Sequence, residues 1–233
     1  MHNIVDLLSI NTFRYEKKYV ISFANENKFI FHLNRHPFLF ERAYDDRYVN
    51  NIYFDSPSMS SYWDNVSGLS KRVKVRIRWY GDLYGHIQSP ILEFKIRNNT
   101  LGSKVSFKLS EMFIDSELTI DSIHKQFNQL DVSSPIKEFL FSLRMTLMNG
   151  YSRKYYVSKD QKYRLTYDSD LQFISVDNYN NSFKHIIKPS NRRVLEIKYD
   201  EHMDDHASQI SNYFPFRMTK SSKYVFGVDK LKL

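Results

Sequence analysis

The chain of 233 residues has no cysteine, only six glycines and six prolines, and no apolar run near the roughly 18 residues of a membrane span. Without cysteine it can form neither a disulfide nor a thiolate zinc site. The low glycine and proline content excludes collagen-like and linker-like sequence. The N-terminal residues lack the basic start and apolar core of a secretory signal. We therefore expect a cytoplasmic protein.

What the chain does have is positive charge, with a formal net charge of +8, and enough apolar residues (42%) to bury a core. This charge predicts affinity for polyanions, such as nucleic acid, phospholipid surfaces or polyphosphorylated small molecules. Nucleic-acid-binding proteins usually display their cations on an exposed patch or helix. Here the cations lie inside predicted strands, interleaved with acidic residues, so we expect no nucleic-acid partner.

The segment 71–80 carries the clearest pattern. Its cations Arg72, Lys74, Arg76 and Arg78 alternate with apolar residues, which predicts a β-strand with one wholly basic face. Two unit charges about 4 Å apart interact by about 4 kcal/mol at an effective dielectric near 20. Four neighbouring cations would therefore destabilise the domain unless an anion compensated them, and we expect that anion to be the substrate.

Other segments repeat this alternation of charged and apolar residues, namely 13–19, 92–97, 162–168 and 195–200, and 52–55 and 104–109 add probable strands. For any one strand, an ordinary sheet with its polar face in water is the simpler interpretation. Together, faces rich in Arg and Lys around a central Glu favour a barrel with its charged faces inward. The helices expected on its outside are 25–40, 58–66, 121–127, 134–148, 204–214 and 222–231.

No linker or repeat divides the chain, so we expect one α+β domain over residues 1–233, with a helical excursion at about 112–148. Inside the barrel, Arg76 and Arg78 can fork onto phosphate oxygens, and lysines supply point charges. These lysines are Lys18, Lys95, Lys198 and Lys223. A carboxylate among phosphates is unfavourable without a bridging cation, so Glu196 predicts Mg²⁺ or Mn²⁺.

Six motifs now resemble those of a known family, in order along the chain. They are RYEKKY at 14–19, SKRVKVRIRWY at 70–80, LEFK at 92–95, RLTYD at 164–168, VLEIKY at 194–199 and SKY at 222–224. The family is the VTC domain, the polyphosphate polymerase branch of the triphosphate tunnel metalloenzymes, which is related to CYTH proteins. The resemblance spans roughly residues 13–228. It implies an antiparallel barrel forming a tunnel lined by Lys, Arg and Glu.

The resemblance also implies an activity and a set of site residues. The activity is transfer of the γ-phosphate of ATP onto a growing inorganic polyphosphate chain, assisted by Mn²⁺ or Mg²⁺. The implied catalytic residues are Arg76, Arg78, Lys18 and Lys223. The implied substrate-binding residues are Lys95, Lys104, Tyr151, Arg153, Arg164 and Lys198, and the implied metal ligands are Glu196, Glu93 and Glu16.

Two departures from the family patterns matter. The opening strand has one Glu and a Lys in place of the E-x-E-x-K of CYTH hydrolases, which favours the polymerase branch and removes one possible metal ligand. Ser106 lies where a basic residue is common. Since no phosphate-sensing region precedes the motifs and no membrane helix follows them, coupling to translocation would need a separate protein and only peripheral association with a membrane. A triphosphatase that hydrolyses tripolyphosphate or organic triphosphates, and a non-catalytic polyanion-binding module, remain as alternatives.

Overall fold

The computed structural model describes residues 2–8, 12–203 and 209–233. Its strands are β1 (Arg14–Ile21), β2 (Glu41–Asp55), β3 (Lys71–Tyr80), β4 (Gly85–Ile87), β5 (Ile91–Asn98), β6 (Leu101–Lys108), β7 (Met112–Ile114), β8 (Arg144–Val157), β9 (Tyr163–Ser175), β10 (Ile186–Ile187) and β11 (Arg193–Asp200). Its helices are α1 (His2–Leu7), α2 (Glu26–Asn34), α3 (Ser60–Val66), α4 (Ile120–Asn128), α5 (Ser134–Phe141) and α7 (Lys223–Leu231), with 3-10 turns at Phe23–Asn25 and Glu201–Met203. None of the helices within these described ranges is long and apolar enough to cross a membrane.

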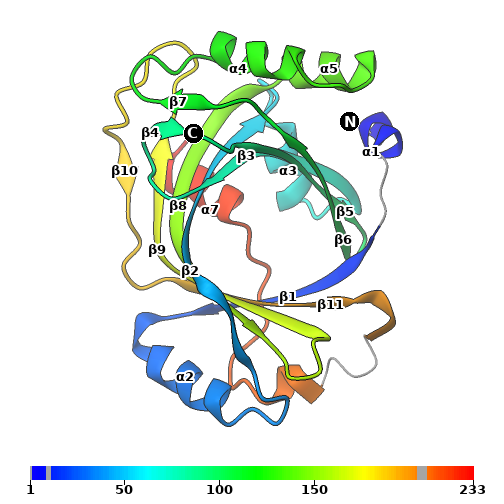
Figure 1. Cartoon of the computed structure of the whole chain (residues 1–233), viewed down its shortest axis with the longest axis vertical. Coiled ribbons are helices and arrows are strands. Elements are labelled where there is room, and N and C mark those ends of the chain that lie inside the picture. Colours follow the sequence, from blue (N-terminus) through cyan, green and yellow to red (C-terminus); the bar gives the residue numbers. More distant parts are fainter. Residues whose placement is uncertain (1, 9–11, 204–208) are drawn as a thin grey trace.

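The main sheet closes on itself. Its strand order is β10-β9-β11-β1-β6-β5-β3-β2-β8, and β8 pairs again with β9, so eight of the described strands form an antiparallel ring (Figure 1). The shortest pairing in the ring is that between β1 and β6, which joins only Arg14 with Gly102 and Tyr15 with Leu101. Closure confirms the expected α+β barrel and rules out an open sheet with a solvated polar face.

The outside of the barrel is apolar and covered by helices. On β3 the alternate residues Val73, Val75, Ile77 and Trp79 are buried in a core that also contains residues of α1, α4 and α5. A second core joins outward residues of β1, β9 and β11 to α2, and the Phe29 ring stacks on that of Tyr167 at 4.7 Å between centroids. Because alternate strand residues face opposite sides, burying this face outward turns the cationic face inward.

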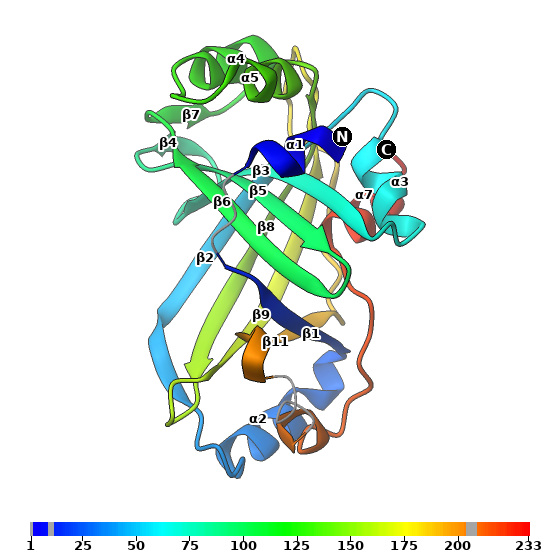
Figure 2. The same cartoon turned by 90° about the vertical axis from the view of Figure 1, so that its right-hand side faces the viewer.

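Helix α7 lies across one end of the barrel, beside α3 (Figures 1 and 2). It packs into a third core with residues of β2, β8 and β9. A Cβ at Gly227 would lie 2.5 Å from Leu147 and 2.7 Å from Phe173, so only glycine allows the helix to approach these strands this closely. The Tyr224 hydroxyl donates to the buried Asp55 carboxylate at 2.6 Å. These contacts hold the N-terminus of α7 against the interior of the barrel.

Some predicted elements have different bounds in the structure. The helix expected at 134–148 is wrong beyond Phe141, because β8 begins at Arg144. The apolar spacing there suits a helix, but β8 gains hydrogen-bonded neighbours on both edges by closing the barrel. The expected helix at 25–40 ends at Asn34, and the strand expected at 52–55 is the end of the 15-residue β2. The expected helix at 204–214 begins outside the described residues, and 209–212 is helical.

Candidate functional site

The barrel encloses a cavity of about 300 Å³. It is lined by Thr12, Arg14, Glu16, Lys18, Tyr53, Lys74, Arg76, Arg78, Lys95, Gly102, Ser103, Lys104, Tyr151, Arg153, Glu196, Lys198, Ser222, Lys223 and Tyr224. Of these described lining residues, ten are basic and two are acidic. The surplus of cations makes the cavity a site for a polyanion.

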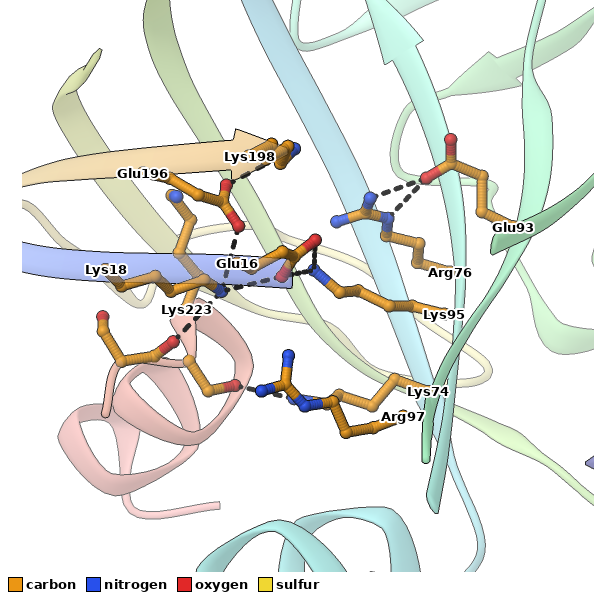
Figure 3. A network of polar contacts seen from close by, with 12 residues as sticks. Glu16, Lys18, Lys74, Arg76, Glu93, Lys95, Arg97, Glu196, Lys198 and Lys223 are labelled. Atoms are coloured by element: carbon orange, nitrogen blue, oxygen red, sulfur yellow. Dashed lines mark hydrogen bonds and ion pairs between the residues drawn. The ribbon is translucent and has the colours of Figure 1, made fainter. Parts of the chain in front are cut away.

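One wall of the cavity holds Arg76 against a buried carboxylate. Both Nε and Nη2 of Arg76 donate to Glu93 Oε2, at 2.8 and 2.7 Å (Figure 3). Lys104 donates to the other Glu93 oxygen at 2.7 Å. Burial raises the pKa of Glu93, but Arg76, Arg78 and Lys104 lower it by more, so the carboxylate stays ionised. Glu93 is only 1% exposed and lies behind the lining. The structure therefore places it as a residue that orients the arginines.

The opposite wall is a network of β1, β5 and β11 residues. Both Glu16 oxygens accept from Lys95, at 3.0 and 2.8 Å, while Lys18 lies 3.4 Å and Lys198 3.5 Å from the Glu196 carboxylate (Figure 3). This contact pattern follows from register, since Lys18 pairs with Glu196 and Glu16 pairs with Lys198 across β1 and β11. Burial raises the pKa of Glu196, but the three lysines lower it well below its ordinary value.

A third group joins the middle of β8 and β9 to α7. Arg153 donates twice to the fully buried Asp168, from Nε at 2.6 Å and from Nη2 at 2.8 Å, and Lys223 donates to the same carboxylate. Burial raises the pKa of the nearby Tyr151 hydroxyl, but Arg153, Arg78 and Lys223 lower this pKa by more, to about 8. Asp168 thus keeps two buried cations in place at the α7 end of the cavity.

Lys74, like Arg72, was expected from the sequence to be a charge at the tunnel mouth or a structural charge and not a site residue, but Lys74 lines the cavity. Its Nζ donates to the Ser222 hydroxyl at 3.1 Å, next to α7. Burial, with Lys18 and Lys95 nearby, lowers the pKa of Lys74 well below its ordinary value. Arg72 lies on the same strand face but donates to the Leu69 carbonyl and does not line the cavity. Lys74 and Arg72 are distinguished by their hydrogen-bond partners, and the alternation that places both on one strand face does not predict those partners.

The structure brings together most of the residues expected at the site. Ten of them line the cavity: Glu16, Lys18, Arg76, Arg78, Lys95, Lys104, Tyr151, Arg153, Glu196 and Lys198, and Lys223 joins them from α7. Arg164 does not line it, because its side chain is exposed near the start of β9. Asp168 and Tyr53 are contact residues that the motifs did not identify as site residues.

The carboxylates of the cavity are the candidate ligands for the expected divalent cation. No group of three or more metal-ligating side chains occurs among the residues that the structure describes. Glu16 is held by Lys95 through two hydrogen bonds, whereas the buried Oε1 of Glu196 makes no such bond in the described chain and has only the longer ion pair with Lys18, at 3.4 Å. Mg²⁺ and Mn²⁺ usually bind through one or two carboxylates together with substrate phosphates. Glu196, assisted by Glu16, therefore fits such an ion when phosphate supplies the remaining oxygens.

The lysines of the cavity predict proton uptake on binding a polyanion. Burial lowers the pKa of Lys95 to about 8, partly offset by Glu16. At about pH 8.5 much of this lysine is neutral, and bound phosphate would raise its pKa, so ATP binding should take up a fraction of a proton, to which Lys74 adds. Affinity should accordingly fall as the pH rises through about 8.

Calorimetric titration with metal-free ATP, in two buffers of different ionisation enthalpy, measures this uptake. Lys95→Arg provides the matched variant, because arginine stays protonated and should reduce the uptake. Equal binding heats in both buffers at pH 8.5 would contradict the prediction.

The geometry of the barrel and its cavity defines a class of protein. A closed antiparallel barrel whose interior presents Arg, Lys and Glu defines the class of barrel proteins that enclose a polyanion. The VTC domain model matches residues 13–232, nearly the whole chain, so the protein belongs to the VTC domain family. Comparison with curated protein sequences finds no match.

Solved structures share the fold at low sequence identity. The PH1819 protein from Pyrococcus horikoshii OT3 has a TM-score of 0.50 and 13% identity, covering 93% of this chain and 99% of its own. A putative adenylate cyclase from Vibrio parahaemolyticus has a TM-score of 0.50 and 11% identity, with 92% and 97% coverage. Another from Bacillus halodurans has a TM-score of 0.50 and 13% identity, with 91% and 95% coverage.

Proposed function

We propose that this protein is an ATP-dependent inorganic polyphosphate polymerase, a phosphotransferase of the cytoplasm. The observation that carries the proposal is the charge of the cavity. Ten lining cations stand against two lining carboxylates and two more, Glu93 and Asp168, that pair with lining cations from behind, which leaves a surplus of positive charge. A bound nucleoside triphosphate brings roughly four negative charges. The remaining positive charge suits a second phosphate chain beside the nucleotide, which transfer between phosphates requires and hydrolysis does not.

The residues support a direct transfer. A terminal oxygen of the acceptor chain attacks the γ-phosphorus, a new P–O bond forms, and the bond from the γ-phosphorus to the β–γ bridging oxygen breaks, releasing ADP. The attacking phosphate is already ionised, so no general base is needed. Arg76 and Arg78, held by Glu93, face the transferring group and stabilise its charge. A divalent cation at Glu196 would add charge neutralisation at the bridging oxygens.

The opening strand favours transfer over hydrolysis. That strand supplies only one carboxylate, Glu16, and its Lys18 lies 3.4 Å from Glu196. Glu16 is itself bound by Lys95. The site is thus poor in metal ligands and rich in phosphate ligands, which suits two phosphate chains better than a water activated by a carboxylate-bound metal.

One incubation tests the proposal. Purified protein with ATP and Mn²⁺ should yield ADP and long-chain polyphosphate in equal phosphate equivalents. Free phosphate without polymer would instead indicate a tunnel triphosphatase, and pyrophosphate release would indicate a cyclase-type reaction. No turnover, with binding that weakens steeply as salt rises, would leave a non-catalytic polyanion-binding module.

A further inference from the structure

An arginine surrounded by tyrosines lies beyond the cationic cavity. The guanidinium of Arg47 lies 5.0 Å from the ring centroid of Tyr44, 5.5 Å from that of Tyr80 and 5.6 Å from that of Tyr155. The rings of Tyr44 and Tyr155 meet edge to face at 5.6 Å. We call these four residues, Tyr44, Arg47, Tyr80 and Tyr155, the mouth cluster.

Strand register makes the mouth cluster a continuation of the cavity wall. On β3, Tyr80 follows Arg76 and Arg78 at intervals of two, and on β8, Tyr155 follows Arg153 at the same interval, so they share the inner face. The guanidinium of Arg153 lies 5.9 Å from the Tyr155 ring. The cluster therefore begins where the phosphate-binding cations end.

The cluster lies at the end of the cation row away from α7. On β3, Lys74 contacts Ser222 at the start of α7, and Tyr80 is six residues further along, about 20 Å in an extended strand. The cavity thus has an end covered by α7 and an end bordered by the mouth cluster. The cavity tyrosines Tyr53, Tyr151 and Tyr224 are nearly inaccessible, at 6% exposure or less, so the mouth cluster offers the accessible aromatic rings.

Irregular pairing of β2 with β8 brings Tyr44 and Arg47 into the mouth cluster. Residues three apart on a regular strand face opposite sides, but β2 has register irregularities between Arg42 and Tyr44 and again between Tyr44 and Arg47. Such irregularities re-aim side chains, and here both Tyr44 and Arg47 lie over β8. Tyr44 and Arg47 also line a shallow pocket, together with Arg42, Ala43 and Asp45. The hollow is therefore produced by a local departure from strand geometry.

The composition of the mouth cluster is unlike that of the cavity. Tyr44 is 59% exposed and Tyr80 is 45% exposed, so a ligand can reach part of each ring beside Arg47. Across the described residues, no carboxylate lies within ion-pair distance of Arg47, whereas its neighbour Arg42 pairs with Asp46. Three rings around one cation favour a flat, electron-rich ring system, because stacking and cation–π contacts both act on ring faces. A bare phosphate chain would gain little from the rings.

We propose that the mouth cluster binds the nucleobase of the nucleoside triphosphate. This nucleobase site rests on the proposed function, and it adds that the donor nucleotide enters the cavity at the end bordered by the mouth cluster. From Tyr80 to Arg76 the strand spans about 13 Å, a distance that ribose and triphosphate together can bridge. The base lies on Tyr44 and Tyr80, and the phosphates run inward past Arg153 to Arg76.

Binding of two ligands that differ only by the nucleoside tests the inference. The double variant Tyr44→Ala/Tyr80→Ala removes the two exposed rings and leaves every cavity cation in place. Its Kd for ATP, measured by calorimetry at neutral pH without metal, should rise about ten-fold, because base stacking on aromatic side chains is lost. Its Kd for inorganic tripolyphosphate should stay at the wild-type value.

The controls separate the two proposals. Tyr179→Ala removes another exposed ring, 72% accessible, and should change neither affinity. Tyr80→Trp should retain ATP affinity, since indole also stacks. Unchanged ATP affinity in the double variant, or an equal loss for both ligands, overturns the nucleobase site while leaving the polymerase proposal intact. Failure of the wild-type protein to bind either ligand overturns the polymerase proposal and the nucleobase site with it.

Discussion

Arg76→Ala should lower the rate of ADP formation from ATP by about a thousand-fold, in the range found when a transition-state arginine is lost from phosphoryl-transfer enzymes. Arg76 lines the cavity, and Glu93 holds it through two hydrogen bonds. The carboxylate beside it, with the Tyr53 and Tyr151 hydroxyls, raises the pKa of Arg76 although burial lowers it, so the charge is permanent. Substrate binding should weaken less than turnover, because the charge is needed most at the transferring phosphate.

The fold should survive this change. Without Arg76, Glu93 keeps Lys104 at 2.7 Å and Arg78 at 3.6 Å, so its charge stays compensated. The matched control is Arg72→Ala, on the same face of β3 but bonded to the Leu69 carbonyl and outside the cavity lining. It should keep near-normal turnover. Turnover near the wild-type rate in a folded Arg76→Ala protein would remove Arg76 from the catalytic site.

Asp168→Asn should be the most destabilising isosteric change in the cavity. It removes the carboxylate that compensates Arg153 and Lys223 in a fully buried position. Breaking a buried charge pair in this way costs about 3–5 kcal/mol, or roughly 10 °C in melting temperature for a chain of this size. Asp170→Asn is the control, because Asp170 is exposed and has φ of 51°, where asparagine is well tolerated.

Two further measurements distinguish lost charge compensation from lost packing. ATP should raise the melting temperature of Asp168→Asn by more than that of the wild type, since its phosphates replace the missing carboxylate beside Arg153. Burial raises the pKa of Asp168, but Arg153 and Lys223 lower it to about 2 from an ordinary value of 3.8. Its contribution to stability is therefore complete above about pH 4 and is lost as the pH falls toward 2, a loss the variant should not show. Equal stabilisation by ATP in both proteins would contradict this account.

Strand β3 shows how much of the site the sequence could predict. A period of two over ten residues determines both the strand and which side is apolar, and the structure has β3 at Lys71–Tyr80, as expected. The same reasoning locates the inward charges of β1, β5 and β11. The alternation alone could not separate Arg72 from Arg76, a distinction that came from the family resemblance, because Arg76 is held by Glu93 of the neighbouring strand β5 and Arg72 by the nearby Leu69 carbonyl.

The differences between the expected and the observed structure have physical causes. The helix expected through residue 148 gave way to β8 because closing the barrel satisfies the hydrogen bonds of β8 on both edges. Arg164 shares the alternation of a lining strand but lies near its exposed end. The mouth cluster depends on irregular pairing within β2, which no periodicity signals. For β8 and for the mouth cluster, the deciding interactions join residues distant in sequence.

By itself, the sequence determined that this protein is a basic, strand-rich member of its family, since alternation and net charge are local properties of the chain. It also determined that the charged faces had to meet an anion, because like charges on one strand face repel. Only the tertiary structure decided which cations are held by carboxylates. It also decided that Lys74 donates to a hydroxyl group and that Arg47 contacts its tyrosines. Those properties depend on burial and on distances between strands, which exist only once the barrel has closed.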